Sequence, residues 1–205
     1  PVDGFAPALK SLAGPVRVDK GTAPLAVADI LHVAGIEVQW GDDPCRLPKA
    51  CKNAAEIAAT REAHLRDGAA MVEFLRWLDE ASPSGGLTEI SVVQALEGFR
   101  RATNALHDIS FDTICGSGPN GAIMHYRVIE ESNRPVGANE LLLVDSGAQY
   151  LDGTTDITRT IAIGDPGEEA RVQYTRVLQG MIAISRVRFP KGITGRDIDG
   201  LARFN

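Results

Sequence analysis

Two aspartates in the stretch Leu141–Thr160 have the residue type and setting that could do chemistry. The apolar residues Leu141–Val144 lead directly into Asp145, and a second strand-like run carries Asp156 after a polar, glycine-containing turn. A carboxylate that ends a buried strand is unfavourable unless it is neutralised, and two carboxylates in one site raise each other's pKa. Solvated loop aspartates are the alternative. The apolar run predicts a buried Asp145, and this favours a bound divalent cation with oxygen ligands.

The distance between the two acids depends on where the hairpin turns. A two-residue turn at Asp152-Gly153 would place Asp156 opposite Gln149, on the same face as Asp145. The acids would then lie about 13 Å apart along the strand, at roughly 3.3 Å per residue. A shared cation would require a bulge at Ser146-Gly147 or a turn elsewhere, and the sequence leaves both open.

His125 is a second candidate, twenty residues before Asp145. It lies near the end of a predicted strand, Ala122–Tyr126, directly after the glycine-rich stretch Gly116–Gly121. That stretch lacks the lysine and the spacing of nucleotide-binding loops, so it predicts tight backbone rather than a phosphate site. The His125 ring could therefore project into a cleft. A hydrogen-bonded structural histidine is the alternative.

Helices must position these strands. Lys52–Glu80 is the longest helical candidate, and Asn53 and Glu56 predict a capping pair at its start. Further helices are predicted from Thr88 to about Thr103, over Glu168–Arg186 and from Thr194 to Ala202. Within the long helix, a mostly apolar stripe recurs at three- and four-residue steps. Its members are Ile57, Arg61, Leu65, Ala69, Val72, Leu75 and Leu78.

Residues 1–48 predict the C-terminal part of a preceding α/β domain. A helix over Pro24–Val33 is followed by an alternating strand over Ile36–Trp40, with too few elements for a complete sheet. The turn Gly41–Pro48, which contains two prolines, marks the boundary. We therefore expect an α+β chain, with residues 49–205 forming the N-terminal portion of a second domain.

Composition and charge argue against several classes of partner. The net charge of −6 and the lack of any run of five basic residues argue against nucleic acid. No stretch approaches the roughly 18 apolar residues of a membrane span. The cysteines Cys45, Cys51 and Cys115 lack metal-ligand spacing, which predicts reduced thiols and a cytoplasmic protein.

Three motifs together resemble aminopeptidase P, the Xaa-Pro aminopeptidase branch of the pita-bread metallopeptidases. They are the runs Gly116–Tyr126, Asp145–Tyr150 and Asp152–Thr160, whose residues, order and spacing all match. The resemblance continues through Asp43–Lys49 and Phe189–Gly195 and so covers essentially the whole chain. It implies the first half of a pita-bread fold, preceded by the tail of a creatinase-type N-terminal domain.

The resemblance also implies roles for the candidate residues. Asp145 and Asp156 match aspartates that bind a pair of divalent metal ions, usually manganese and sometimes zinc or cobalt. His125 matches a histidine that hydrogen-bonds the scissile carbonyl or the developing tetrahedral intermediate. The implied reaction removes the N-terminal residue from peptides with proline in second position. The implied full-length protein is a homodimer.

The chain departs from the family pattern in its metal ligands. The family set also includes one histidine and two glutamates on later strands, and the 205 residues end before any of them. The other histidines, His32, His64 and His107, all precede His125 and have no matching context. We therefore expect an internal fragment with two of five protein ligands.

Alternative functions within the same fold remain. A prolidase differs only in preferring dipeptides, whereas a creatinase is expected to lack this metal pair. A metal-free relative that acts as a binding module would have no reason to keep two buried acids. A histidine and two glutamates in strand contexts after Asn205 would favour a metallopeptidase over a binding module.

We predict that the 205 residues by themselves have negligible peptidase activity, because two aspartates make an incomplete metal site. Hydrolysis of Xaa-Pro-Yaa peptides in the presence of Mn²⁺ measures this. Cleavage by the 205-residue chain that Asp156→Ala abolishes would contradict the prediction.

Overall fold

The computed structural model describes residues 4–204, and their contacts divide the chain into two compact units. The first unit extends to Ile57 and the second begins at Ala58. The domain boundary that the sequence predicts after Pro48 remains a prediction.

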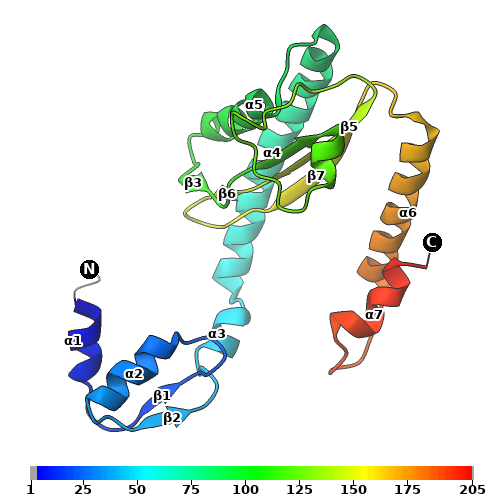
Figure 1. The fold of residues 1–205 in the computed structure, drawn as a ribbon. Coiled ribbons are helices and arrows are strands. Elements are labelled where there is room, and N and C mark those ends of the chain that lie inside the picture. The colour runs from blue at the N-terminus through cyan, green and yellow to red at the C-terminus, as the bar shows by residue number, and fades with distance from the viewer. Residues whose placement is uncertain (1–3, 205) are drawn as a thin grey trace. The chain divides into compact units, whose positions relative to one another are not determined.

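The first unit contains a pair of short parallel strands. β1 (Val16–Val18) pairs in register with β2 (Val38–Trp40), and α2 (Leu25–Val33) connects them along the chain (Figure 1). Pro24 directly precedes α2, where its missing N–H costs no helical hydrogen bond. The helix predicted over Pro24–Val33 is thus confirmed. The strand predicted over Ile36–Trp40 is also present as β2, but it begins two residues later, at Val38. The unit also contains α1 (Phe5–Lys10) and α3 (Arg46–Ala50).

The second unit is built on a three-stranded antiparallel sheet of order β4-β5-β7. A two-stranded antiparallel pair, β3 with β6, lies in the same unit. The predicted helices are confirmed within two residues at each end, including the reciprocal Asn53–Glu56 cap that precedes α4. The elements are α4 (Ala54–Ala81), η2 (Ser82–Ser84), α5 (Glu89–Ala102), β3 (Asp108–Ile109), β4 (Ile114–Ser117), η3 (Gly118–Ala122), β5 (Glu140–Ser146), β6 (Ala148–Gln149), β7 (Ile157–Ile163), α6 (Gly167–Arg186) and α7 (Gly195–Ala202).

The hairpin between β5 and β7 keeps one register along its whole length. β5 and β7 pair over all seven residues of each strand, and the bridge between Gln149 and Thr154 continues the same register. A bulge at Ser146-Gly147 is therefore not needed. The turn lies at Leu151-Asp152, one residue before the Asp152-Gly153 turn considered from the sequence. The backbone N–H of Tyr150 donates to the Gly153 carbonyl and closes it.

The main core forms where α4 and α5 cover one face of this sheet (Figure 1). Alternate residues of β5 point toward the two helices, as the two-residue period of a strand requires. The buried members are Met71, Phe74 and Leu78 of α4, Val92 and Leu96 of α5, and Cys115, Leu142, Val144 and Ile163 of the sheet. Burial raises the pKa of the Cys115 thiol to about 12, so it stays protonated at neutral pH.

The face of α4 that enters the core differs from the predicted stripe. Leu65 and Val72 were expected to be inside, but their side chains are 72% and 66% exposed. Of the predicted stripe, Leu78 is buried and Leu75 packs partly buried against the core. The buried residues of α4 are Ala63, Asp67, Ala70, Met71, Phe74 and Leu78. The prediction was wrong for the first five members of the stripe, because the buried face follows Asp67, an acid that is paired with Arg100 in the interior.

A buried hydrogen-bond network centres on the carboxylate of Asp67. Arg100 of α5 donates to it from Nε at 2.8 Å and from Nη2 at 3.1 Å, and both side chains are fully buried. The hydroxyls of Tyr150 and Thr155 each donate to it at 2.8 Å. Burial and the adjacent Asp67 raise the pKa of the Tyr150 hydroxyl, which keeps it a donor. The network therefore ties α4 and α5 to both arms of the hairpin.

The segment before β4 approaches the hairpin closely at Gly147. A Cβ built on Gly147 would overlap the Ser110 hydroxyl and the Thr155 carbonyl oxygen. The Ser110 hydroxyl donates to that carbonyl at 3.0 Å, and the Ser110 N–H donates to the Gly147 carbonyl. Position 147 therefore has no room for a side chain.

The helices described over residues 4–204 include none with the length and apolarity that a membrane crossing needs. The three cysteines are free thiols, as predicted.

We predict that Asp67→Ala lowers the free energy of unfolding by about 3–5 kcal/mol, because it leaves the buried Arg100 guanidinium uncompensated. Urea denaturation measures the loss. Asp79→Ala, at an exposed position of the same helix, is the matched control and should change stability by less than about 0.5 kcal/mol. Equal effects of the two substitutions would contradict this role for Asp67.

Gly147→Ala should lower the free energy of unfolding by about 1–3 kcal/mol, since the added methyl group overpacks a site with no free space. Gly68→Ala is the control, because Gly68 lies inside α4 with no neighbouring atom within 4 Å of the place that a methyl group would take. There the same change should stabilise the protein by roughly 0.5–1 kcal/mol. Thermal unfolding of both variants compares them, and a gain in stability at Gly147 would refute the close approach.

Candidate metal-binding hairpin

Asp145 and Asp156 lie on the same face of the hairpin. Asp145 pairs with Thr158, and Asp156 precedes Thr158 by two residues, directly before β7 begins. Residues two apart on a strand share a face, so the two acids are diagonal neighbours. Diagonal neighbours have Cα atoms roughly 7–8 Å apart, far closer than the 13 Å or so of the alternative turn. The observed register thus brings both carboxylates to one place without a bulge.

The burial expected for Asp145 is only partly observed. Asp145 is half-buried and Asp156 is exposed. Asp145 is not fully buried because the residues of β5 alternate: Leu142, Val144 and Ser146 face the helices and are buried, and Asp145 points to the opposite side. The long apolar run hid this alternation in the sequence.

The donor chemistry of the pair fits a hard divalent cation. Carboxylate oxygens are ligands that manganese, magnesium and calcium accept. The Thr158 hydroxyl donates to Asp145 Oδ1 at 2.7 Å and orients that carboxylate. Over residues 4–204, the structure holds no cluster of three or more His, Cys, Asp or Glu side chains suited to a metal. The hairpin can therefore contribute two carboxylates to a site and no more.

Hydrogen bonds of the neighbouring residue Thr155 fix the backbone next to Asp156. The Thr155 hydroxyl donates to Asp67 and accepts from the Ala148 N–H at 3.0 Å, so it anchors both arms of the hairpin. The Thr155 N–H donates to the Ala148 carbonyl at 2.9 Å. The acid-bearing segment is thus fixed by a buried contact one residue away.

The tip of the hairpin is held by Arg66 of α4. Its guanidinium donates to both oxygens of Asp152 at 3.0 Å and lies 5.1 Å from the centre of the Tyr150 ring. The hydrogen bond from Arg66 lowers the pKa of the Asp152 carboxyl. Asp152 is therefore a structural partner of α4.

His125 does not lie on a strand. The predicted strand Ala122–Tyr126 is wrong, since η3 ends at Ala122 and His125 follows in a turn with φ of 54°. Left-handed backbone is uncommon for residues other than glycine and is held by the surrounding structure. The His125 side chain is exposed, and within residues 4–204 no hydrogen bond joins it to either aspartate.

The helix η3, which precedes His125, packs on the acid-bearing face of the sheet at its end. A Cβ on Gly121, at the end of η3, would be 3.5 Å from the Leu143 Cβ. Leu143 lies two residues before Asp145 on β5 and shares its face. The same position is 3.0 Å from the Gly116 carbonyl, and Gly116 pairs with Leu143. Gly121, four residues before His125, therefore packs on the acid-bearing face.

Sequence reasoning missed two buried acids that support this site, Asp67 and Glu89. Asp67 had a weak signal, because aspartate is a poor residue for a helix interior unless it has a partner. Glu89 follows the Thr88 cap and has the form of an ordinary first-turn acid. Both side chains are fully buried, and only the tertiary structure shows their donors.

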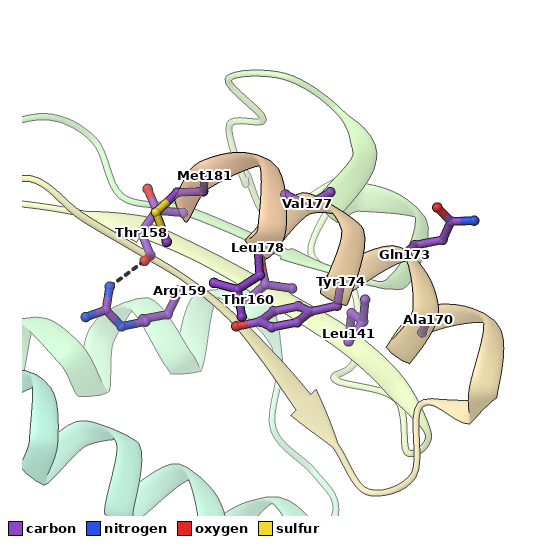
Figure 2. A pocket seen from close by; sticks show the side chains of 10 residues that line it. All are labelled: Leu141, Thr158, Arg159, Thr160, Ala170, Gln173, Tyr174, Val177, Leu178 and Met181. Atoms are coloured by element: carbon purple, nitrogen blue, oxygen red, sulfur yellow. Dashed lines mark hydrogen bonds between the residues drawn. The ribbon is translucent and has the colours of Figure 1, made fainter. Parts of the chain in front are cut away.

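An apolar groove of about 730 Å³ lies between α6 and strands β5 and β7 (Figure 2). Tyr174, Val177 and Met181 of α6 line one side, and Leu141 and Thr160 line the other. No acid or histidine lines it. Thr158, whose hydroxyl donates to Asp145, also lines it, so the groove lies on the acid-bearing face of the sheet and adjoins Asp145.

Comparison with known proteins identifies the family. Metallopeptidase family M24 matches residues 58–204. Aminopeptidase P2 of Arabidopsis thaliana is 46% identical over 171 residues, which are 83% of this chain and 24% of that protein. The chain thus spans about a quarter of the length of this curated relative. The resemblance to aminopeptidase P that the motifs predict is confirmed.

Solved structures show the same fold. X-prolyl aminopeptidase from Caenorhabditis elegans, described as a cytosolic enzyme with a di-nuclear active site, aligns with a TM-score of 0.83 and 35% identity over 98% of this chain and 34% of that one. Xaa-Pro dipeptidase from Bacillus anthracis aligns with a TM-score of 0.77 and 27% identity over 99% of this chain and 55% of that one. The mixed fold is part of the predicted pita-bread fold. The chain belongs to metallopeptidase family M24.

Proposed function

We propose that the full-length protein is a metal-dependent aminopeptidase that removes the N-terminal residue from peptides with proline in second position. The observation that carries this proposal is the register that places Asp145 and Asp156 on one face of the hairpin. The names of the relatives support the peptidase class and the preference for Xaa-Pro peptides.

In this proposal, Asp145 and Asp156 hold two divalent metal ions together with ligands from outside these 205 residues. Manganese is the proposed metal, with zinc or cobalt as alternatives. Two carboxylates this close repel each other, and a shared cation removes that repulsion. Bound metal ions would activate water near neutral pH and polarise the scissile carbonyl.

The proposed role of His125 is to hydrogen-bond the scissile carbonyl or the tetrahedral intermediate. His125 is exposed and follows η3, whose Gly121 packs on the acid-bearing face. A peptide bound at metal ions held by Asp145 and Asp156 would lie on that face. A preorganised donor aimed at developing negative charge stabilises the transition state. His125 would thus act on the substrate and not as a metal ligand.

The proposed setting is a cytoplasmic homodimer that acts on peptides, with no nucleic-acid or membrane partner. The description of the Caenorhabditis elegans relative as cytosolic supports this compartment. The acidic net charge of −6 is in keeping with a protein that does not bind nucleic acid.

A prolidase is the second candidate, because Xaa-Pro dipeptidase from Bacillus anthracis has the same fold at 27% identity. The two activities differ in the substrate that they accept. Assays with Xaa-Pro dipeptides and Xaa-Pro-Yaa tripeptides, run with the same full-length protein and Mn²⁺, distinguish them. Preferential cleavage of the tripeptide is the expected result.

We predict that Asp156→Ala in the full-length protein lowers kcat/KM for a Xaa-Pro-Yaa peptide by about a thousandfold or more, because several kcal/mol of charge stabilisation are lost with the metal. Bound manganese, measured by elemental analysis, should fall in parallel. Asp152→Ala is the matched control, since Asp152 lies four residues earlier in the same hairpin and its carboxylate pairs with Arg66 of α4. Equal losses in both variants would argue against a metal role for Asp156.

A further inference from the structure

Glu89, the first residue of α5, has a fully buried carboxylate that accepts hydrogen bonds from one continuous segment. Its Oε1 accepts from the Ser117 N–H at 2.7 Å and from Asn120 Nδ2 at 3.0 Å. Its Oε2 lies 3.0 Å from the Tyr126 hydroxyl and accepts from the Arg134 N–H at 3.0 Å. All four donors belong to residues 117–134, the segment that contains His125.

These donors carry no formal charge. The Arg134 guanidinium is engaged elsewhere, where it donates to Glu140 Oε1 at 2.7 Å. A buried carboxylate is costly unless its oxygens are hydrogen-bonded, so the structure favours keeping every donor in place. The N-terminus of α5 adds a favourable partial charge. Glu89 therefore restrains the segment at four points at once.

Two of the residues bound to Glu89 flank His125 in the sequence: Asn120 precedes it and Tyr126 follows it. Asn120 belongs to η3, and Asn120 Nδ2 also donates to the Tyr126 hydroxyl at 2.9 Å. Burial raises the pKa of that hydroxyl, so it remains protonated and able to donate. Tyr126 is buried whereas its neighbour His125 is exposed. The buried tyrosine thus anchors the residue next to the strained φ of His125.

Backbone contacts close the same segment at its far end. The Glu89 N–H donates to the Arg134 carbonyl at 3.0 Å, and the Val136 N–H donates to the Leu87 carbonyl at 2.9 Å. The Ile90 N–H donates to the Asn133 side chain at 3.1 Å. The start of α5 therefore defines where the segment begins and ends.

We propose that Glu89 is a positioning residue, whose buried carboxylate holds residues 117–134 so that His125 is presented on the acid-bearing face of the sheet. Glu89 is too deeply buried to touch a peptide, so it acts through His125. The effect on activity rests on the proposed function, whereas the restraint on the segment does not.

The test is Glu89→Gln in the full-length protein loaded with Mn²⁺. Glutamine keeps the size but replaces one acceptor oxygen with a donor that faces other donors. We expect kcat/KM for a Xaa-Pro-Yaa peptide to fall by roughly ten- to a hundredfold, as small displacements of catalytic groups do. Bound manganese should stay at the parental level. Glu97→Gln is the control, because Glu97 is on the same helix and pairs with Arg101 there.

A double-mutant cycle separates positioning from general damage. If Glu89 acts through His125, Glu89→Gln should change kcat/KM by less than about twofold in a His125→Ala background. Tyr126→Phe, which removes one hydroxyl, should likewise lower kcat/KM only when His125 is present. This variant tests the proposal if Glu89→Gln does not fold. An equal loss with and without His125 overturns the proposal, as does an unchanged rate in both variants.

Amide hydrogen exchange over residues 117–134 tests the restraint without activity. For Glu89→Gln we expect amide exchange in this segment to be faster than in the parental protein, and exchange in α4 to change less. Unchanged exchange overturns the proposal even if the peptidase is active. A full-length protein that shows no metal-dependent Xaa-Pro cleavage, but has the faster exchange, would refute the proposed function and leave the restraint by Glu89 established.

Discussion

Asp67 lies where the long helix α4 meets the hairpin, and four hydrogen bonds converge on its two buried oxygens. Arg100 supplies the charge that makes this carboxylate tolerable away from water, and the hydroxyls of Tyr150 and Thr155 use its remaining acceptor capacity. Removing Asp67 would take the shared acceptor away from all three partners, which lie on α5 and on both arms of the hairpin. The hairpin that carries Asp145 and Asp156 thereby acquires a fixed place on α4.

Glu89 plays a similar part for the other half of the site. It is also fully buried, and it collects donors from a segment with little regular structure. One buried carboxylate thus anchors the strand pair with the two acids, and the other anchors the segment with His125. Both meet the same three-stranded sheet, whose covered face forms the core and whose opposite face bears the acids. This division keeps the two acids out of the main core.

The local elements were largely predictable from the sequence. Asn53 and Glu56 marked the start of α4, Thr88 marked the start of α5, and Thr194 marked the start of α7, because caps depend on residues only three positions apart. The strand Ala122–Tyr126 was wrong, since its apolar residues satisfied the pattern while Asn120 and Tyr126 were bound to Glu89 in a different conformation. Local patterns do not include such distant partners.

The sequence by itself determined the candidate site residues, Asp145, Asp156 and His125, and the resemblance that assigns the family. It left the register of the hairpin open between the turn at residues 152–153 that Asp-Gly favours and a turn elsewhere. Only the tertiary structure decided between them, through contacts of Tyr150 and Thr155 with an acid more than eighty residues earlier in the chain. The same structure turned Asp67 rather than Leu65 inward, because a paired buried carboxylate fixes orientation more specifically than apolar area does.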